Sequence, residues 1–151
     1  MLIRPIRHHD IDEVLDLGAA MHEESAYRLL PYHRRKVRRL AEVYTSGHEA
    51  YCGLVAEEEE KIIAMFGGYV TDYFFCDERI ACDMVLFVDR RFRGGTAAFR
   101  LIRAFRRWAE TRKVREICLS ISTEVNTERT GRLYERLGLL RVGAIYKQRL
   151  Y

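Results

Sequence analysis

Apolar residues recur along the chain at two spacings, which predicts a mixture of helices and strands. Between residues 96 and 112 they fall three or four positions apart, as at Leu101 and Phe105, and arginines occupy the opposite side, as in an amphipathic helix. Apolar runs over 51–56 and 61–70 are separated by four glutamates, which predicts a hairpin with a solvated acidic tip. The expected strands cover residues 1–7, 51–56, 61–70, 80–88, 114–121 and 140–150, and the expected helices cover 9–18 (with Gly18 at its end or at a bend), 33–44, 96–112 and 127–137.

The order of these elements predicts a single α/β domain. Strands and helices follow one another as β-α-α-β-β-β-α-β-α-β, and no linker rich in proline, glycine or serine divides the 151 residues. A chain of this length buries roughly 68–70% of its unfolded surface, which is enough for a core without covalent staples. We expect one domain over residues 1–151, built on a mixed, mostly antiparallel sheet of six to seven strands flanked by four helices.

Composition indicates the class of protein and the cellular compartment to expect. Hydrophobic residues make up 48% and charged residues 32% of the chain, a balance typical of globular proteins that excludes long disordered segments. No apolar stretch approaches the length of a membrane-spanning helix, and the first residues lack the apolar core of a signal peptide. These features predict a cytoplasmic protein with no membrane partner.

The four cysteines, at positions 52, 76, 82 and 118, predict neither a disulfide framework nor a metal site. No two of them form the closely spaced pairs that tetrahedral zinc sites usually use. Reduced thiols fit a cytosolic protein that has a core of this size. We expect each cysteine to be a small buried apolar residue, and we expect no metal.

Charge is distributed unevenly along the chain. Residues 1–80 hold 10 Lys and Arg against 15 Asp and Glu, whereas residues 81–151 hold 16 against 7, within a net charge of +4. The C-terminal half therefore favours an anionic partner: nucleic acid, a membrane surface or a phosphorylated cofactor. The basic runs over 33–39 and 96–112 raise the option of nucleic acid binding. A solvated helix face is the simpler explanation, because no aromatic residues are interleaved for base stacking.

The most informative segment runs from Asp83 to Ala98, where an apolar strand is followed by a basic loop, two glycines and a helix. Adjacent glycines at 94 and 95 let the backbone turn tightly and approach a ligand closely. The first N–H groups of a helix have no intrahelical partner and carry partial positive charge, so they favour an anion such as pyrophosphate. The same pattern also fits an ordinary strand–turn–helix junction with a basic rim, and it is neither a P-loop nor a GxGxxG motif.

Two motifs in this order resemble the GNAT family of N-acetyltransferases. The run RGGTAA at residues 93–98 is similar to that family's acyl-CoA pyrophosphate loop, with Thr96 where glycine is common. The run YERLGL at residues 134–139 is similar to its C-terminal Tyr-Glu-x-Leu-Gly-Phe signature. The glycine loop also resembles that of a branch of small acetyltransferases associated with phages and prophages. Together with the order of elements, the resemblance covers nearly the whole chain.

The resemblance implies acetyl-CoA as a cosubstrate, bound in a V-shaped gap between the strands over 80–88 and 114–121. The pyrophosphate would lie on the glycine loop, and the pantetheine arm would pair with backbone groups near Leu86 and Val88. A backbone N–H near Val88 would polarise the acetyl carbonyl. The residues expected to bind the cosubstrate are Leu86, Phe87, Val88, Arg93, Gly94, Gly95, Thr96, Ala97, Ala98, Asn126, Thr127 and Thr130.

The reaction that the resemblance implies is direct attack of an amine on the acetyl thioester, with two proton transfers. An amine of pKa near 10.4 is neutral in only about one molecule in 2,500 at pH 7, so a base or a desolvated pocket has to raise that fraction. The resemblance implies Tyr134 as the acid that protonates the departing thiolate. For the base the sequence leaves Asp83 and Glu24 open, with Glu23, His22 or a chain of water molecules as further options.

Asp83 is an isolated carboxylate in an apolar strand, so it either serves a site or is paired internally. Regular strand alternation places its side chain on the face of Val85 and Phe87, opposite Leu86 and Val88.

We therefore expect an N-acetyltransferase that moves an acetyl group from acetyl-CoA to a primary amine. The acceptor stays open among a small molecule, a protein lysine and a protein N-terminus, because a fold does not define a substrate. Two alternatives remain: a non-catalytic acyl-CoA-binding module, and a nucleic-acid-binding protein that uses the basic C-terminal half. A homodimer is compatible with the family resemblance.

Overall fold

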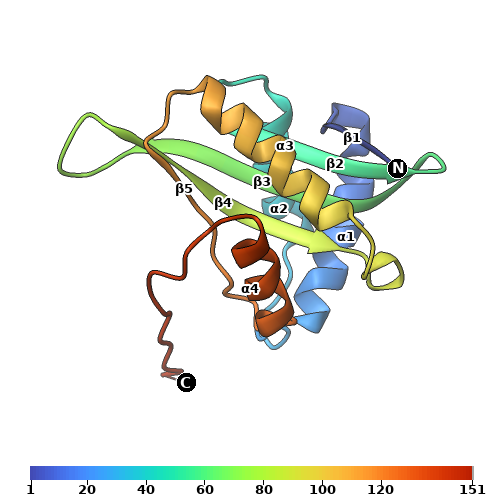
Figure 1. Ribbon diagram of the computed structural model, residues 1–151. Helices are drawn as coiled ribbons and strands as arrows, with labels where there is room; N and C mark the ends of the chain where they lie inside the picture. Colours follow the sequence, from blue (N-terminus) through green and yellow to red (C-terminus); the bar gives the residue numbers. More distant parts are fainter. Residues whose placement is uncertain (151) are drawn as a thin grey trace.

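The computed structural model describes residues 1–150, in which five strands form one mixed sheet with helices on both faces (Figure 1). The strands are β1 (Leu2–Pro5), β2 (Tyr51–Glu58), β3 (Lys61–Asp72), β4 (Arg79–Val88) and β5 (Glu116–Cys118). The helices are α1 (Ile11–Glu24), α2 (Arg34–Thr45), α3 (Ala97–Thr111) and α4 (Thr127–Arg136), with short 3-10 turns at His8–Asp10 and Arg90–Phe92. The strands lie in chain order; β1 to β4 are antiparallel and β5 runs parallel to β4. The α/β class is confirmed, and so is the order of elements as far as α4.

The sheet separates two apolar layers. On one face α3 packs against the sheet, and the ring centroids of Phe66 and Phe105 lie 4.6 Å apart in that layer (Figure 1). On the other face α1 covers a second cluster that includes Leu17, Met65 and Phe87, and α2 packs against α1 through Ala41. Burying one such side chain contributes about 1.5–3 kcal/mol. These layers hold the sheet on which the site is built.

A hairpin with an acidic tip joins β2 and β3, as predicted. Its two turn residues, Glu59 and Glu60, both have positive φ, at 49° and 60°. This is the conformation of a type I′ turn, in which Asn and Gly are the preferred residues. Two glutamates hold it at a cost in backbone strain.

Helix α1 continues through Gly18 to Glu24, so the expected end or bend at that glycine is wrong. The hydroxyl of Tyr32 lies 2.6 Å from the position that a Cβ of residue 18 would take, and it donates to the Leu15 carbonyl at 3.0 Å. Gly18 therefore makes room for a tyrosine packed across the helix. A glycine inside a helix costs about 0.5–1 kcal/mol relative to alanine, which this contact offsets.

A buried ion-pair network ties β1 to the start of α1 and to β2. Arg4 lies between two carboxylates: its Nη1 is 2.7 Å from Asp10 Oδ2 and its Nη2 is 2.6 Å from Glu57 Oε2. The side chains of Arg4 and Asp10 are only 10% and 3% exposed. Hydrogen bonding to Arg4 holds the pKa of Asp10 below its usual value. Such a network is costly to break because it would leave a charge buried without its partner.

Part of the basic run over 33–39 is neutralised within the fold. Arg34 Nη1 lies 2.6 Å from Asp16 Oδ1, and Arg38 pairs with Asp12. These contacts fasten α2 to α1 and give two of the arginines a partner within the chain.

Residues 140–150 form no strand, so the expected last strand is wrong, and the sheet has five strands rather than six to seven. Val142 and Tyr146 are more than 90% exposed. Strand β5 is also shorter than the expected 114–121, covering only Glu116–Cys118. Alternating apolar residues form a strand only beside a partner edge, and a three-residue edge strand pairs with little of an eleven-residue segment.

The cysteines differ in exposure. Cys52 is buried as expected, but Cys76 and Cys118 are exposed and Cys82 is half-buried, so burial of all four is wrong. Within residues 1–150 no group of three His, Cys, Asp or Glu side chains is placed to hold a metal ion. No helix in the same range is both long and apolar enough to cross a membrane.

Candidate active site

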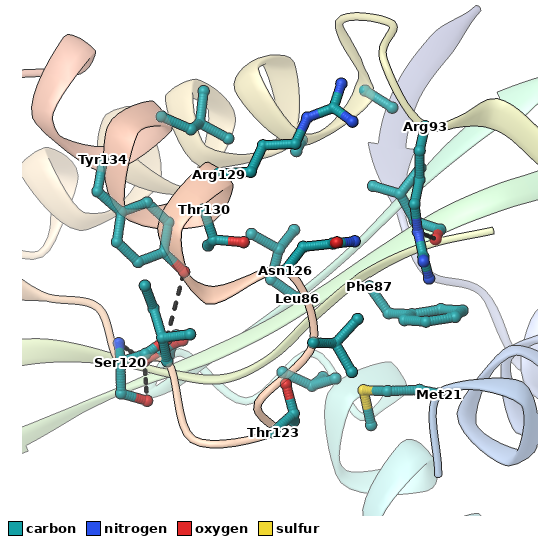
Figure 2. A pocket seen from close by; sticks show the side chains of 18 of the residues that line it. Met21, Leu86, Phe87, Arg93, Ser120, Thr123, Asn126, Arg129, Thr130 and Tyr134 are labelled. Atoms are coloured by element: carbon teal, nitrogen blue, oxygen red, sulfur yellow. Dashed lines mark hydrogen bonds between the residues drawn. The ribbon is translucent and has the colours of Figure 1, made fainter. Parts of the chain in front are cut away.

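A cleft opens where β4 and β5 part. The two strands pair only as far as Cys82 and Cys118, after which the chain following β5 leaves the sheet while β4 continues to Val88. The resulting cleft has a volume of about 670 Å³ and is walled by β4, the glycine loop and α4 (Figure 2). This is the gap in which the family resemblance implies that the cosubstrate binds.

The end of β4 turns backbone groups that do not bond to β3 toward the cleft, and of these the Val88 carbonyl accepts from Arg93 Nε at 3.0 Å. Asp89 N donates to the Ile63 carbonyl at 2.9 Å, so alternate residues of β4 bond to β3. By that alternation the N–H and C=O groups of Leu86 and Val88 point to the opposite side, where β5 no longer runs. A strand edge of this kind offers donors and acceptors to an extended ligand.

A β-bulge in β4 changes the side of the sheet on which Asp83 lies. Gly67 pairs with Val85 but Gly68 pairs with Asp83, which leaves Met84 as an extra residue. Partners in an antiparallel ladder share a face, so Asp83 lies on the face of Leu86 rather than on the face of Val85. The alternation expected from the sequence is therefore wrong at this position, because an extra residue shifts the pattern by one.

Asp83 and Tyr134 meet at Ser120. Asp83 Oδ1 accepts hydrogen bonds from Ser120 N at 2.9 Å and Ser120 Oγ at 3.2 Å, and the Tyr134 hydroxyl donates to the Ser120 carbonyl at 3.3 Å (Figure 2). Burial raises the pKa of Asp83 more than these bonds lower it. Burial, with a smaller effect of the Asp83 charge, also raises the pKa of Tyr134. The carboxylate is thereby a stronger base than usual, and the phenol stays protonated at neutral pH.

The glycine loop lines the cleft with Gly94 and Gly95, and it has backbone N–H groups without an acceptor. Gly94 has φ +99°, a backbone conformation that other residues adopt at a cost. Within residues 1–150 no backbone or side-chain oxygen accepts from the N–H of Gly94, Gly95 or Thr96. A Cβ at Gly94 would lie 3.4 Å from Arg129 Nη2, so an arginine of α4 reaches the loop. These groups suit an anion.

Arg93 does not point into the anion site. Its Nη1 pairs with Glu24 Oε2 at 2.7 Å, its Nε donates to the Val88 carbonyl at 3.0 Å, and its guanidinium lies 5.2 Å from the centre of the Phe87 ring. Figure 2 shows the side chain directed toward Phe87. Glu24 is therefore held in an ion pair, and it does not line the cleft.

The start of α4 contributes two of its three predicted residues to the cleft. Asn126 and Thr130 line it, whereas Thr127 does not, and neither does Thr96 of the glycine loop. Asn126 has φ +49° and its side chain makes no capping hydrogen bond. Asn126 therefore occupies the N-cap position of α4 without capping the helix through its side chain.

Several lining residues were not predicted. Arg129, Arg132 and Arg136 line the cleft from α4, Ser120 comes from the segment after β5, and Met21 comes from α1. The three arginines recur at helical spacing, so a basic face on α4 was visible in the sequence. Nothing in the sequence marks Ser120, because its position depends on where β5 leaves the sheet.

Comparison with known proteins identifies the architecture. Residues 17–139 match the model of the acetyltransferase (GNAT) family. No curated protein sequence matches the chain. The resemblance to a phage-associated branch receives no support from these matches and stays a prediction.

Solved structures share the fold over the whole chain. A ribosomal-protein-alanine N-acetyltransferase from Brucella melitensis biovar Abortus 2308 has 19% identity and TM-score 0.75, with 99% of this chain and 100% of that chain covered. A tetramutant of the BH1408 protein from Bacillus halodurans has 21% identity and TM-score 0.81, with 99% and 100% covered. An aminoglycoside N-acetyltransferase in complex with CoA has 16% identity and TM-score 0.78, with 98% and 93% covered. At these identities the likeness shows the fold alone.

Proposed function

Because the chain belongs to the acetyltransferase (GNAT) family, we propose that it transfers an acetyl group from acetyl-CoA to a primary amine. The observation that carries the proposal is the meeting of Asp83 and Tyr134 at Ser120, beside the outward-facing backbone of β4. An acid and a base are thus held at the place where the family fold would put a thioester. The thioester supplies an activated acyl group; the remaining chemistry comes from the chain.

The glycine loop supports binding of a pyrophosphate. The N–H groups of Gly94, Gly95 and Thr96 have no acceptor within residues 1–150, the loop leads directly into the first turn of α3, and Arg129 adds a full positive charge beside Gly94. Arg93 supports the loop from behind by bonding to the Val88 carbonyl and to Glu24. The two arginines therefore have different proposed roles: Arg129 binds the anion together with the backbone, and Arg93 positions the loop.

The backbone of Leu86 and Val88 supports binding of an extended arm. We propose that the N–H and C=O groups of Leu86 pair with the amides of the pantetheine and that the N–H of Val88 or its neighbour faces the acyl oxygen, while the Val88 carbonyl accepts from Arg93. A backbone donor aimed at a developing oxyanion contributes about 3–4 kcal/mol to catalysis.

The proton transfers use the two groups at Ser120. The amine nitrogen attacks the acyl carbon and its proton passes to Asp83, whose raised pKa makes it a better acceptor. The carbon–sulfur bond breaks, and Tyr134 donates its proton to the leaving sulfur. We assign no base role to Glu24, because it is paired with Arg93 and does not line the cleft. The acceptor stays unassigned among small amines, protein lysines and protein N-termini.

Calorimetric titration of acetyl-CoA at about 150 mM salt, an ionic strength that screens distant surface charges, tests the binding half of the proposal. The variant is Gly95→Glu and its matched control is Gly95→Gln, which has the same shape without the charge. A Cβ at this position meets only the Phe92 carbonyl, at 3.6 Å, so both variants are expected to fold. We expect the wild type to bind acetyl-CoA with a micromolar Kd and the Gln variant to bind more weakly than the wild type. The Glu variant should bind at least tenfold more weakly than the Gln variant.

Arg129→Gln tests whether Arg129 binds the anion. The control is Arg107→Gln on α3, because Arg107 does not line the cleft. Only the Arg129 variant is expected to weaken binding. Failure of the folded wild type to bind acetyl-CoA would refute the proposed function. Binding without acetylation of any amine in a broad panel would support the non-catalytic alternative instead.

A further inference from the structure

Cys82 and Cys118 face each other across the two strands that border the cleft. They are direct partners in the parallel register of β4 and β5, so their side chains lie on one face of the sheet. Neighbouring strands are about 4.7–4.9 Å apart. Disulfides join residues whose Cα atoms are about 4.4–6.8 Å apart. The pair therefore meets the distance requirement without a rearrangement of either strand.

The two thiols differ in access, as a stepwise oxidation needs. Cys118 is exposed and Cys82 is half-buried. Burial, and then the neighbouring thiol of Cys118, raises the pKa of Cys82, so Cys118 is the better first reactant. Cys52 is buried and its pKa is raised by burial to about 12, which removes it as a competitor.

The position of the pair lets a bond form with little movement. Strand β5 has three residues and lies at the edge of the sheet, so its Cys118 can move toward β4 by the fraction of an ångström that bond formation requires. Neither cysteine lines the cleft, and neither takes part in the proposed acetyl transfer.

We propose that Cys82 and Cys118 are a redox modification site that takes a low-molecular-weight disulfide such as oxidised glutathione. The thiolate of Cys118 attacks one sulfur of the reagent and releases one glutathione thiolate. Cys82 then attacks the mixed disulfide at Cys118 Sγ, forms the Cys82–Cys118 bond and releases the second glutathione. The two protein thiols lose two protons and two electrons, and the glutathione disulfide gains them as two thiols.

The bond would join the strands at their last paired position, one residue before Asp83 and two residues before Ser120. It would therefore restrain the segment whose carbonyl accepts from Tyr134. This consequence rests on the proposed function. We expect the oxidised protein to have at least threefold lower affinity for acetyl-CoA, with full recovery after reduction.

Intact-mass spectrometry and non-reducing peptide mapping after treatment with oxidised glutathione test the proposal. We expect a loss of about 2 Da, the two thiol hydrogens, and one linked pair of peptides that contains Cys82 and Cys118. The matched control is Cys76→Ser, which removes the other exposed thiol and is expected to form the bond like the wild type. Cys118→Ser should not lose mass, and Cys82→Ser should stop at a glutathione adduct on Cys118.

Three outcomes would overturn the proposal: a stable glutathione adduct on Cys118 of the wild type, a link that involves Cys76, or a link between two chains. The mass readout needs no substrate. A disulfide without an effect on acetyl-CoA affinity would remove only the consequence for the cleft, whereas absence of acetyl-CoA binding by the reduced protein would count against the proposed function alone.

Discussion

Removing the Tyr134 hydroxyl separates its structural contribution from its chemical one. The side chain is 8% exposed, and the hydroxyl donates one long hydrogen bond, at 3.3 Å, to the exposed Ser120. Tyr134→Phe keeps the buried ring and removes that bond, which is worth about 0.5–1.5 kcal/mol net. Water can replace the donor to Ser120. We therefore expect the free energy of unfolding to fall by about 1 kcal/mol or less.

The chemical effect should be much larger. A positioned general acid contributes about 10²–10⁴-fold, and a tenfold change in rate corresponds to about 1.4 kcal/mol. If Tyr134 protonates the leaving sulfur, its loss therefore raises the activation free energy by roughly 3–5 kcal/mol. This exceeds the structural effect severalfold, so the two roles predict different numbers.

The assay measures kcat from the loss of thioester absorbance at saturating acetyl-CoA, with an amine chosen by screening. Urea unfolding and calorimetric acetyl-CoA binding are measured on the same preparations. The matched control is Tyr146→Phe, at a tyrosine that is 93% exposed. We expect kcat of the Tyr134 variant to fall at least 100-fold with binding within threefold of wild type. A kcat within threefold of wild type would refute the acid role, and a parallel loss of binding would assign Tyr134 to packing.

Three further changes test the charges and the turn. Arg4→Gln leaves Asp10 buried without its partner, and urea unfolding is expected to show a loss of about 3–5 kcal/mol. Because Arg4 lowers the pKa of Asp10, that stabilisation is present above the unfolded pKa, near 4, and is lost as the pH falls, which unfolding at pH 3–6 measures. Because burial raises the pKa of Asp83, ionised Asp83 costs stability at neutral pH, so Asp83→Asn should melt at an equal or higher temperature while acetylation is lost. Replacing Glu59 and Glu60 by Asn and Gly should stabilise the hairpin by about 1 kcal/mol, again by urea unfolding.

Local patterns predicted most elements and the glycine loop because each depends on neighbouring residues. The helix over 96–112 and the hairpin at the four glutamates follow from periodicity, and Gly94 lies where the backbone has a positive φ. The resemblance added Tyr134, which the structure brings to Ser120.

The errors arose where the outcome depends on a distant partner. Asp83 changed face because of an extra residue opposite Gly67 and Gly68, which no pattern within β4 reveals. Residues 140–150 have strand alternation, but pairing requires an edge that β5 is too short to offer. Arg129 was not predicted as a site residue, because only the packing of α4 beside the glycine loop brings it near Gly94.

The bulge in β4 places one residue outside the regular ladder between β3 and β4. Met84 is that extra residue, and its side chain is 52% exposed, so the surface tolerates many side chains at this position. Gly67 already pairs with Val85 and Gly68 with Asp83, so deleting the codon for Met84 would join these two pairs into a regular ladder and leave Asp83 and the fully buried Ala81 on their present faces. Natural variation at position 84 is therefore expected to include in-frame deletions as well as substitutions.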